Sequence, residues 1–116
     1  MPQCDLKRLQ LAANHLQILQ SLLAQHVPQA EVWAYGSRVT GGAHEGSDLD
    51  VVLRNPVDLT RAVEGWVELK EALQDSRLPM LVELHTWAGL PTAFHHNIEA
   101  GYVVVQAAGK GGGDGE

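Results

Sequence analysis

Apolar residues recur every three or four positions along residues 5–27, and this period predicts an amphipathic helix. Pro28 is expected to end it, because proline cannot continue a helical hydrogen-bond ladder. A second helical period covers residues 58–75, where Asp58 is a suitable N-cap. A third helix is expected over residues 91–101, with a proline in its first turn. The chain therefore carries three predicted helices of ordinary length.

Short apolar runs between these helices predict strands at residues 30–35, 49–53 and 80–87. A last apolar run at residues 102–105 is expected to form a short strand or a docked segment. The order helix, strand, strand, helix, strand, helix predicts an α/β (α+β) fold, with helices packed on a small mixed β-sheet.

The length of 116 residues fits one domain, which we place at residues 1–108. Residues 109–116 are mostly glycine and contain no apolar side chain, so they are expected to be a disordered tail. The single cysteine, Cys4, excludes an internal disulfide.

The formal net charge of −6 disfavours direct binding to nucleic acid, which needs clustered lysine and arginine. It fits a small-molecule enzyme or a protein that meets a basic partner. No apolar run approaches the roughly 20 residues that span a membrane, and the first residues lack the apolar block of a signal peptide. The expectation is a cytoplasmic protein.

Two aspartates, Asp48 and Asp50, stand two positions apart at the start of the second predicted strand. Side chains at this spacing share one face of a strand, roughly 6.6 Å apart. Asp50 interrupts an otherwise apolar run, and two like charges on a buried strand are costly unless a cation lies between them. Mg²⁺ prefers carboxylate and phosphate oxygens. The alternative is a solvent-exposed strand start with two surface aspartates.

Glu83 interrupts the third apolar strand in the same way. If that strand pairs beside the second, Glu83 joins the two aspartates on one face. Three carboxylates can hold two metal ions, which clamp the attacking and leaving oxygens of a phosphoryl displacement. The alternative is an edge-strand glutamate that faces water.

Gly36 and Ser37 follow the first predicted strand directly. Glycine permits a positive φ and a close approach, and backbone amides at such a turn suit a phosphate. A plain turn after a strand is the simpler alternative, because Gly-Ser alone is a weak signal.

Taken together, these motifs resemble the DNA polymerase β-like nucleotidyltransferases. The shared pattern is a strand, Gly36-Ser37, ten residues, Asp48-x-Asp50, a helix, and a strand that carries Glu83. Within that superfamily the chain looks like the minimal nucleotidyltransferases, the antitoxin partners in HEPN–MNT toxin–antitoxin pairs. The resemblance covers about residues 6–101.

Two positions depart from the family pattern. Many relatives have aspartate where this chain has Glu83, and a longer side chain changes the geometry of the third acid. A base is common shortly before the Asp-x-Asp motif, where this chain has His44 and Glu45.

The resemblance implies that Asp48 and Asp50 bind two Mg²⁺ ions, and that Glu83 binds the catalytic ion and helps to activate the acceptor hydroxyl. It also implies a cofactor-binding loop for ATP or another NTP. The residues of that loop would be Gly36, Ser37 and Arg38, with Arg38 in contact with a phosphate. The alternative for Arg38 is a solvated arginine in the loop.

By resemblance, the activity is Mg²⁺-dependent transfer of AMP from ATP to a hydroxyl of a partner protein. The expected acceptor is a tyrosine of a HEPN toxin, in a hetero-oligomer. An alternative is an antitoxin with weak or no catalysis that neutralises its partner by occlusion. A third alternative is a small-molecule nucleotidyltransferase of the aminoglycoside-modifying kind, which usually carries a second domain for its acceptor.

Other polar and aromatic positions are assigned to the fold. The three tryptophans, Trp33, Trp66 and Trp87, are expected in or beside the core. His85 lies two positions from Glu83 and is expected either near the metal site or as an ordinary strand residue.

Overall fold

The structure is a computed structural model that describes residues 3–4, 9–41 and 47–107. Within these residues the helices are α1 Ala13–His26, α2 Ser37–Thr40, α3 Trp66–Gln74, the 3₁₀ turn η2 Trp87–Gly89, and α4 Thr92–Glu99. The strands are β1 Gln3–Cys4, β2 Glu31–Tyr35, β3 Leu49–Arg54, β4 Val82–Thr86 and β5 Tyr102–Gln106.

The described strands form one five-stranded mixed sheet in the order β1-β5-β2-β3-β4. Strand β2 runs antiparallel to both of its neighbours, β3 and β5. The outer pairs, β1 with β5 and β3 with β4, are parallel. The expected α+β fold with a small mixed sheet is therefore confirmed.

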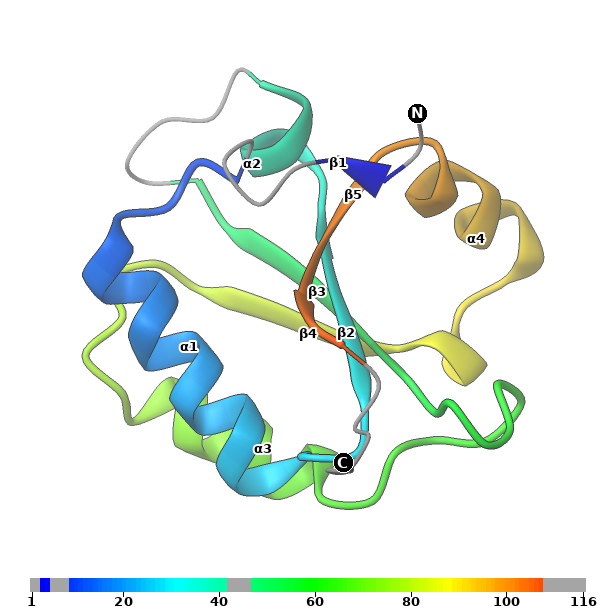
Figure 1. Ribbon diagram of the computed structural model, residues 1–116, viewed down its shortest axis with the longest axis horizontal. Helices are drawn as coiled ribbons and strands as arrows, with labels where there is room; N and C mark the ends of the chain where they lie inside the picture. Colours follow the sequence, from blue (N-terminus) through cyan, green and yellow to red (C-terminus); the bar gives the residue numbers. More distant parts are fainter. Residues whose placement is uncertain (1–2, 5–8, 42–46, 108–116) are drawn as a thin grey trace.

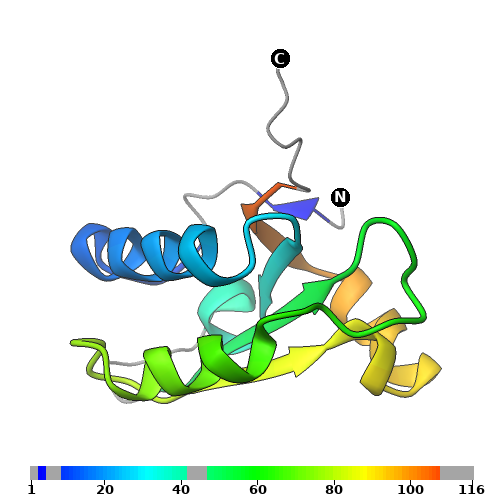
Figure 2. The same ribbon diagram turned by 90° about the horizontal axis from the view of Figure 1, so that it is seen from below.

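The two faces of the sheet bury different side chains. Helices α1 and α3 lie side by side and α4 lies on the other side of the molecule, as two perpendicular views show (Figures 1 and 2). The larger core joins α1 and α3 to inward-facing residues of the strands, among them Val32, Val51, Leu53 and Val103. The opposite face carries a smaller cluster of Trp33, Val52, Trp87 and Ile98.

The second helix begins later than its apolar period predicts. The expected start at Asp58 is wrong, because the side chain of this residue closes a local turn and accepts hydrogen bonds from the Thr60 amide and hydroxyl at 3.0 and 2.6 Å. Helix α3 starts only at Trp66, after Gly65 at φ 90°. A side chain at Gly65 would meet the carbonyl oxygen of His26, so the end of α1 fixes where α3 begins.

The predicted start of the first helix is also wrong, because residues 9–12 precede α1, which begins at Ala13. The Gln10 amide in that segment donates to the Arg38 carbonyl oxygen at 2.7 Å in place of a helical bond. Residues 5–8 and the predicted tail 109–116 lie outside the described residues. Strand β4 is shorter than the predicted run, and β5 forms the expected last strand. Strand β1 was not predicted, because two residues carry no periodicity. Within the described residues, no helix is long and apolar enough to cross a bilayer.

Candidate active site

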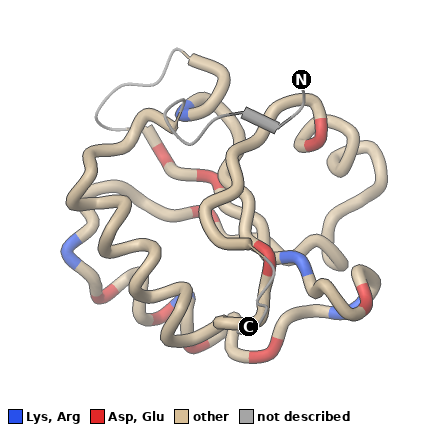
Figure 3. Tube along the Cα trace, in the orientation of Figure 1, with Lys and Arg blue, Asp and Glu red and all other residues tan. Residues whose placement is uncertain are grey.

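Three polar side chains lie level with one another on the adjacent strands β2, β3 and β4. Asp50 on β3 is the direct partner of Glu83 on β4, and on its other side it is the partner of Tyr35 on β2. Paired positions on neighbouring strands point to the same face of a sheet, so these three side chains share one face. It is the face opposite α1 and α3, and acidic segments of β3 and β4 lie close together beneath α2 (Figure 3).

Asp48 lies two residues before Asp50, just ahead of β3, and is exposed. Glu83 is also open to solvent, with 43% of its side chain exposed. Among the described residues, no three His, Cys, Asp or Glu side chains are gathered tightly enough to form a ready-made metal site. The structure therefore places Asp50 and Glu83 on one face and Asp48 at its entrance, as an open group of carboxylates.

The charges of this group act on one another. Partial burial raises the pKa of Asp50, the negative charges of Glu83 and Asp48 raise it further, and His85 opposes them. Burial, followed by the charges of Asp50 and Glu83, raises the pKa of Tyr35 to about 12. The site accordingly holds an excess of negative charge that a bound cation would stabilise.

Gly36 ends β2 in a conformation that suits only glycine. Its φ is 85°, and a Cβ built there would overlap the Oδ2 atom of Asp50. Its carbonyl oxygen accepts hydrogen bonds from the amides of Val39 and Thr40 at 2.9 Å each, which starts the short helix α2. Ser37, the first residue of α2, is exposed.

Arg38 does not lie in solvent. Only 6% of it is exposed, and its guanidinium donates hydrogen bonds to the backbone carbonyls of Ser47 and Gln10. The structure thus places Gly36, Asp50 and Glu83 together with Ser37 and Asp48 nearby, and directs the side chain of Arg38 toward backbone partners.

Aromatic side chains support the same face of the sheet further along β2 and β3. The rings of Trp33 and Trp87 meet edge to face at 5.4 Å, and both are buried as expected. The guanidinium of Arg54 lies over both rings and forms an ion pair with Glu31 at 2.5 Å. This packing lies toward the end of β3 away from Asp50, since Arg54 is the last residue of that strand.

Two further polar residues, His85 and Tyr35, lie near the carboxylates. His85 shares the face of Glu83, and its Nε2 atom lies 3.9 Å from the Glu83 Oε1 atom. Tyr35 is a site residue that the sequence did not single out. Its position immediately before Gly36 is the signal that could have identified it, because the pairing of β2 with β3 places it opposite Asp50.

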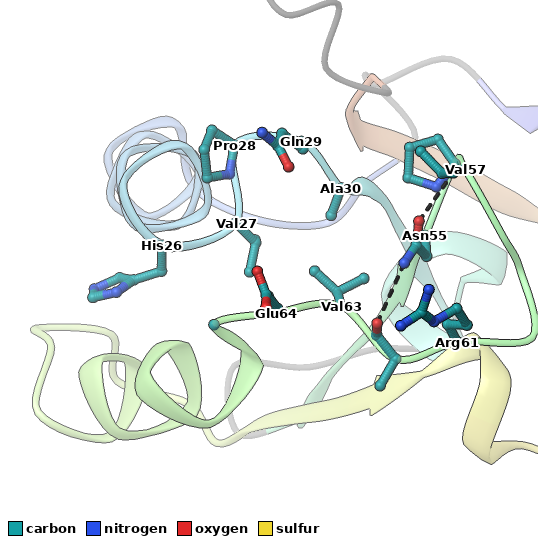
Figure 4. A pocket seen from close by; sticks show the side chains of 13 residues that line it. His26, Val27, Pro28, Gln29, Ala30, Asn55, Val57, Arg61, Val63 and Glu64 are labelled. Carbon is teal, nitrogen blue, oxygen red and sulfur yellow. Dashed lines mark hydrogen bonds between the residues drawn. The ribbon is translucent and has the colours of Figure 1, made fainter.

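A pocket of about 620 Å³ lies away from these carboxylates. It is lined by residues at the end of α1 and in the loop that follows β3, including His26, Asn55 and Arg61 (Figure 4). Asn55 follows the last residue of β3, whereas Asp50 is near the first, so the pocket opens at the opposite end of that strand. Its side chains are not those that the sequence identifies as reactive.

The carboxylate face fits a divalent metal and a phosphate group by its chemistry. Asp48, Asp50 and Glu83 supply the hard oxygen donors that Mg²⁺ prefers. Because Gly36 has no side chain, the Asp50 carboxylate can lie directly against the Gly36-Ser37 turn. These residues would hold the metal, with the Gly36-Ser37 turn next to it.

Known proteins resemble this chain in sequence and in fold. The family model of the nucleotidyltransferase domain matches residues 14–104. The chain is 38% identical over 105 residues to the probable protein adenylyltransferase MntA of Haemophilus influenzae, a match that covers 89% of each protein. A solved structure described as a toxin-antitoxin with AMP-PNP superposes with a TM-score of 0.64, over 84% of this chain and 76% of that one. At 19% identity, that superposition shows the fold alone.

The matched residues include every position of the Gly-Ser turn and the carboxylate face. The resemblance to the minimal nucleotidyltransferases is confirmed by this coverage and by the identity to MntA. The chain belongs to the nucleotidyltransferase domain family and is a nucleotidyltransferase.

Proposed function

We propose that this nucleotidyltransferase transfers AMP from ATP to a hydroxyl group of a partner protein, with Mg²⁺ at the carboxylate face. The observation that carries the proposal is the pairing of Asp50 with Glu83 beside Gly36, where the absence of a side chain lets the Asp50 carboxylate lie directly against the backbone. The identity to a probable protein adenylyltransferase supports a protein as the acceptor.

In this reaction the acceptor oxygen attacks the α-phosphorus of ATP. The bond from that phosphorus to the oxygen bridging to the β-phosphate breaks, and pyrophosphate leaves with the bond's electron pair. Glu83 is the group proposed to take the proton of the acceptor hydroxyl, because it is the most open carboxylate of the strand pair. Mg²⁺, when bound, would neutralise the charge that develops on the phosphate oxygens.

The remaining residues have proposed roles in binding. Asp48 and Asp50 would hold two Mg²⁺ ions together with Glu83, and the turn at Gly36 and Ser37 would hold the triphosphate. Ser37 suits this role because it is exposed at the start of α2, directly after Gly36, which contacts the Asp50 carboxylate. ATP is the proposed nucleotide, and a structural relative described with AMP-PNP, an analogue of ATP, supports that choice.

The proposed acceptor is a tyrosine of a HEPN-family toxin, and this chain is the antitoxin that modifies it. The toxin-antitoxin described among the structural relatives supports a partner protein. The net charge of −6 favours a basic partner over a nucleic-acid acceptor. The open carboxylate face also requires a second molecule that presents its hydroxyl in line with the α-phosphate.

A second candidate function is neutralisation by occlusion, without transfer. The exposure of Asp48 and Glu83 favours it, since the described carboxylates do not form a closed metal site. Catalysis and occlusion differ in whether the partner gains mass.

The experiment uses the protein, ATP, Mg²⁺ and the product of the neighbouring gene. Intact-mass spectrometry should show the partner gaining one or more AMP groups, and tandem spectrometry should place them on tyrosine. A stable complex whose partner keeps its mass would favour occlusion. Modification of a small molecule without any partner would contradict the proposed acceptor.

A further inference from the structure

Arg38 is a buried cation that binds backbone on two sides. Its Nε and Nη2 atoms donate to the Ser47 carbonyl oxygen at 3.1 and 2.9 Å, and its Nη1 atom donates to the Gln10 carbonyl oxygen at 2.6 Å. Burying a guanidinium is costly unless its donors are satisfied, so these bonds define the conformation of this side chain.

Ser47 and Gln10, two of the residues that Arg38 binds, belong to segments that flank the carboxylate face. Ser47 immediately precedes Asp48 and lies two residues before β3. Gln10 belongs to the segment before α1, and its amide donates to the Arg38 carbonyl oxygen at 2.7 Å. One residue therefore ties the entrance of β3 and the chain before α1 to the turn that begins at Gly36.

We propose that Arg38 is a positioning residue that fixes Asp48 relative to the Gly36-Ser37 turn, and that it does not itself bind phosphate. The inference rests on the proposed function, because it assigns the carboxylate and the turn to the metal and the triphosphate. Asp48 precedes β3 and lies between two anchored peptide groups. The Leu49 amide after it donates to the Leu81 carbonyl oxygen at 2.9 Å, and the paired hydrogen bonds of Arg38 hold the Ser47 carbonyl before it.

The fork of donors on the guanidinium is what this role needs. Two nitrogens of Arg38 share one carbonyl while a third reaches another, nine and 28 positions away along the chain. A lysine ammonium is a point charge on a flexible stem and cannot reproduce this geometry. Arg38→Lys should keep the positive charge and lose the fixed position of Asp48.

The test compares Arg38→Lys and Arg38→Gln with the parent protein. Both variants should require more Mg²⁺ for half-maximal transfer and show a lower kcat, with a KM for ATP at saturating Mg²⁺ that stays near the parent value. Misplacement by about 1 Å costs about 100-fold in rate, which is the size of loss expected for Arg38→Gln. Arg38→Lys carries the test if Arg38→Gln does not fold.

Hydrogen exchange provides a readout that needs no turnover. The Gln10 amide donates to the Arg38 carbonyl oxygen, and the Leu49 amide donates to the Leu81 carbonyl oxygen. In protein without metal or nucleotide, both amides should exchange faster in the two Arg38 variants than in the parent. This comparison does not depend on catalysis. If the parent protein transfers nothing, the proposed function fails. The positioning role is then judged on hydrogen exchange and on the Mg²⁺ affinity measured by calorimetry.

Arg54→Gln is the matched control. Arg54 is also largely buried, with 14% of its side chain exposed, and it ends the same strand β3 beside Glu31. It should lower thermal stability while leaving the Mg²⁺ requirement unchanged. The proposal is overturned if Arg38→Lys raises only the KM for ATP, if both Arg38 variants keep the parent Mg²⁺ requirement and exchange, or if Arg54→Gln shifts that requirement equally.

Discussion

The carboxylate of Asp50 occupies the space that a side chain at Gly36 would need. The Oδ2 atom of Asp50 is the nearest atom to a Cβ built on Gly36, closer than real Cβ contacts come. The two residues lie 14 positions apart in the sequence, and the pairing of β2 with β3 brings them together. The Gly-Ser motif and the Asp-x-Asp motif are therefore one structural unit.

This relationship predicts that Gly36→Ala removes activity. The substitution would force alanine into the left-handed region, which costs about 1–2 kcal/mol, and would also displace the Asp50 carboxylate. Gly41→Ala is the control, because Gly41 has a φ of 106° but open space around it. Thermal unfolding should show both variants destabilised, while the transfer assay should show a near-complete loss only for Gly36→Ala. Equal transfer activity of Gly36→Ala and Gly41→Ala would show that activity does not depend on the close contact between Gly36 and Asp50.

Asp50→Asn should make the metal-free protein more stable at neutral pH. A pKa raised in the folded state means that the folded protein binds the proton more tightly than the unfolded chain does. The free energy of unfolding therefore falls as pH rises through the raised pKa of Asp50, and the full cost is present at pH 7. Asparagine carries no such charge, so its advantage should disappear as pH falls toward the ordinary value of 3.8.

Thermal unfolding between pH 3 and pH 8 without metal checks this prediction, over a range set by the ordinary pKa of about 4 for aspartate. Glu71→Gln, an exposed acid in the middle of α3, controls for the change in net charge. Added Mg²⁺ should reverse the order and stabilise only the parent protein. A parent protein that stays more stable than Asp50→Asn without metal at pH 7 would contradict the repulsion.

Tyr35 should ionise late, and the protein should lose stability at alkaline pH as a result. The pKa of Tyr35 is raised from 10.0 to about 12, so the unfolded chain releases this proton first. Stability contributed by the neutral phenol is present below pH 10 and is lost as pH rises to about 12. Tyr35→Phe should flatten this decline.

Absorbance of the phenolate during alkaline titration measures the ionisation directly. The chain has two tyrosines, and the Tyr35→Phe variant identifies which part of the signal belongs to Tyr35. A transition at the ordinary value of 10.0 would show that Tyr35 does not face the carboxylates.

Ser37→Ala should weaken ATP binding by about 1.5–3 kcal/mol, the range for a hydrogen bond to a charged group. The reason is the exposed position of Ser37 at the start of α2, directly after the glycine that contacts the Asp50 carboxylate. Calorimetry with Mg²⁺ and a non-hydrolysable ATP analogue measures the affinity. Ser21→Ala, an exposed serine on α1, should bind as the parent does, and equal affinities for all three proteins would leave Ser37 as an ordinary turn residue.

The fold could be predicted from the hydrophobic periodicity of the sequence. Two acids of the candidate site could be predicted because they are charged residues within apolar strands. Asp50 and Glu83 stand out because each interrupts an apolar strand, and the parallel register of β3 and β4 makes them neighbours. The start of α3 was missed because side-chain bonds of Asp58 and the conformation of Gly65 override helical periodicity. The effect of Gly65 depends on a contact between distant segments, because a side chain at Gly65 would meet the carbonyl oxygen of His26.

The same reason explains why Arg38 was read as a surface residue or a phosphate ligand. Its partners Gln10 and Ser47 are backbone carbonyls, which leave no signature in a sequence. Only the folded chain brings them around one guanidinium.

The active site at the carboxylate face is tested most directly by transfer from labelled ATP to the neighbouring gene's protein. The parent is compared with Glu83→Gln, Glu83→Asp and Glu71→Gln. Mg²⁺-dependent labelling is expected from the parent and from Glu71→Gln, because Glu71 is an exposed helix residue outside the site. Labelling is also expected from Glu83→Asp, which keeps a carboxylate opposite Asp50, and none from Glu83→Gln. Labelling by Glu83→Gln at the parent rate would contradict the assignment of the carboxylate face as the active site.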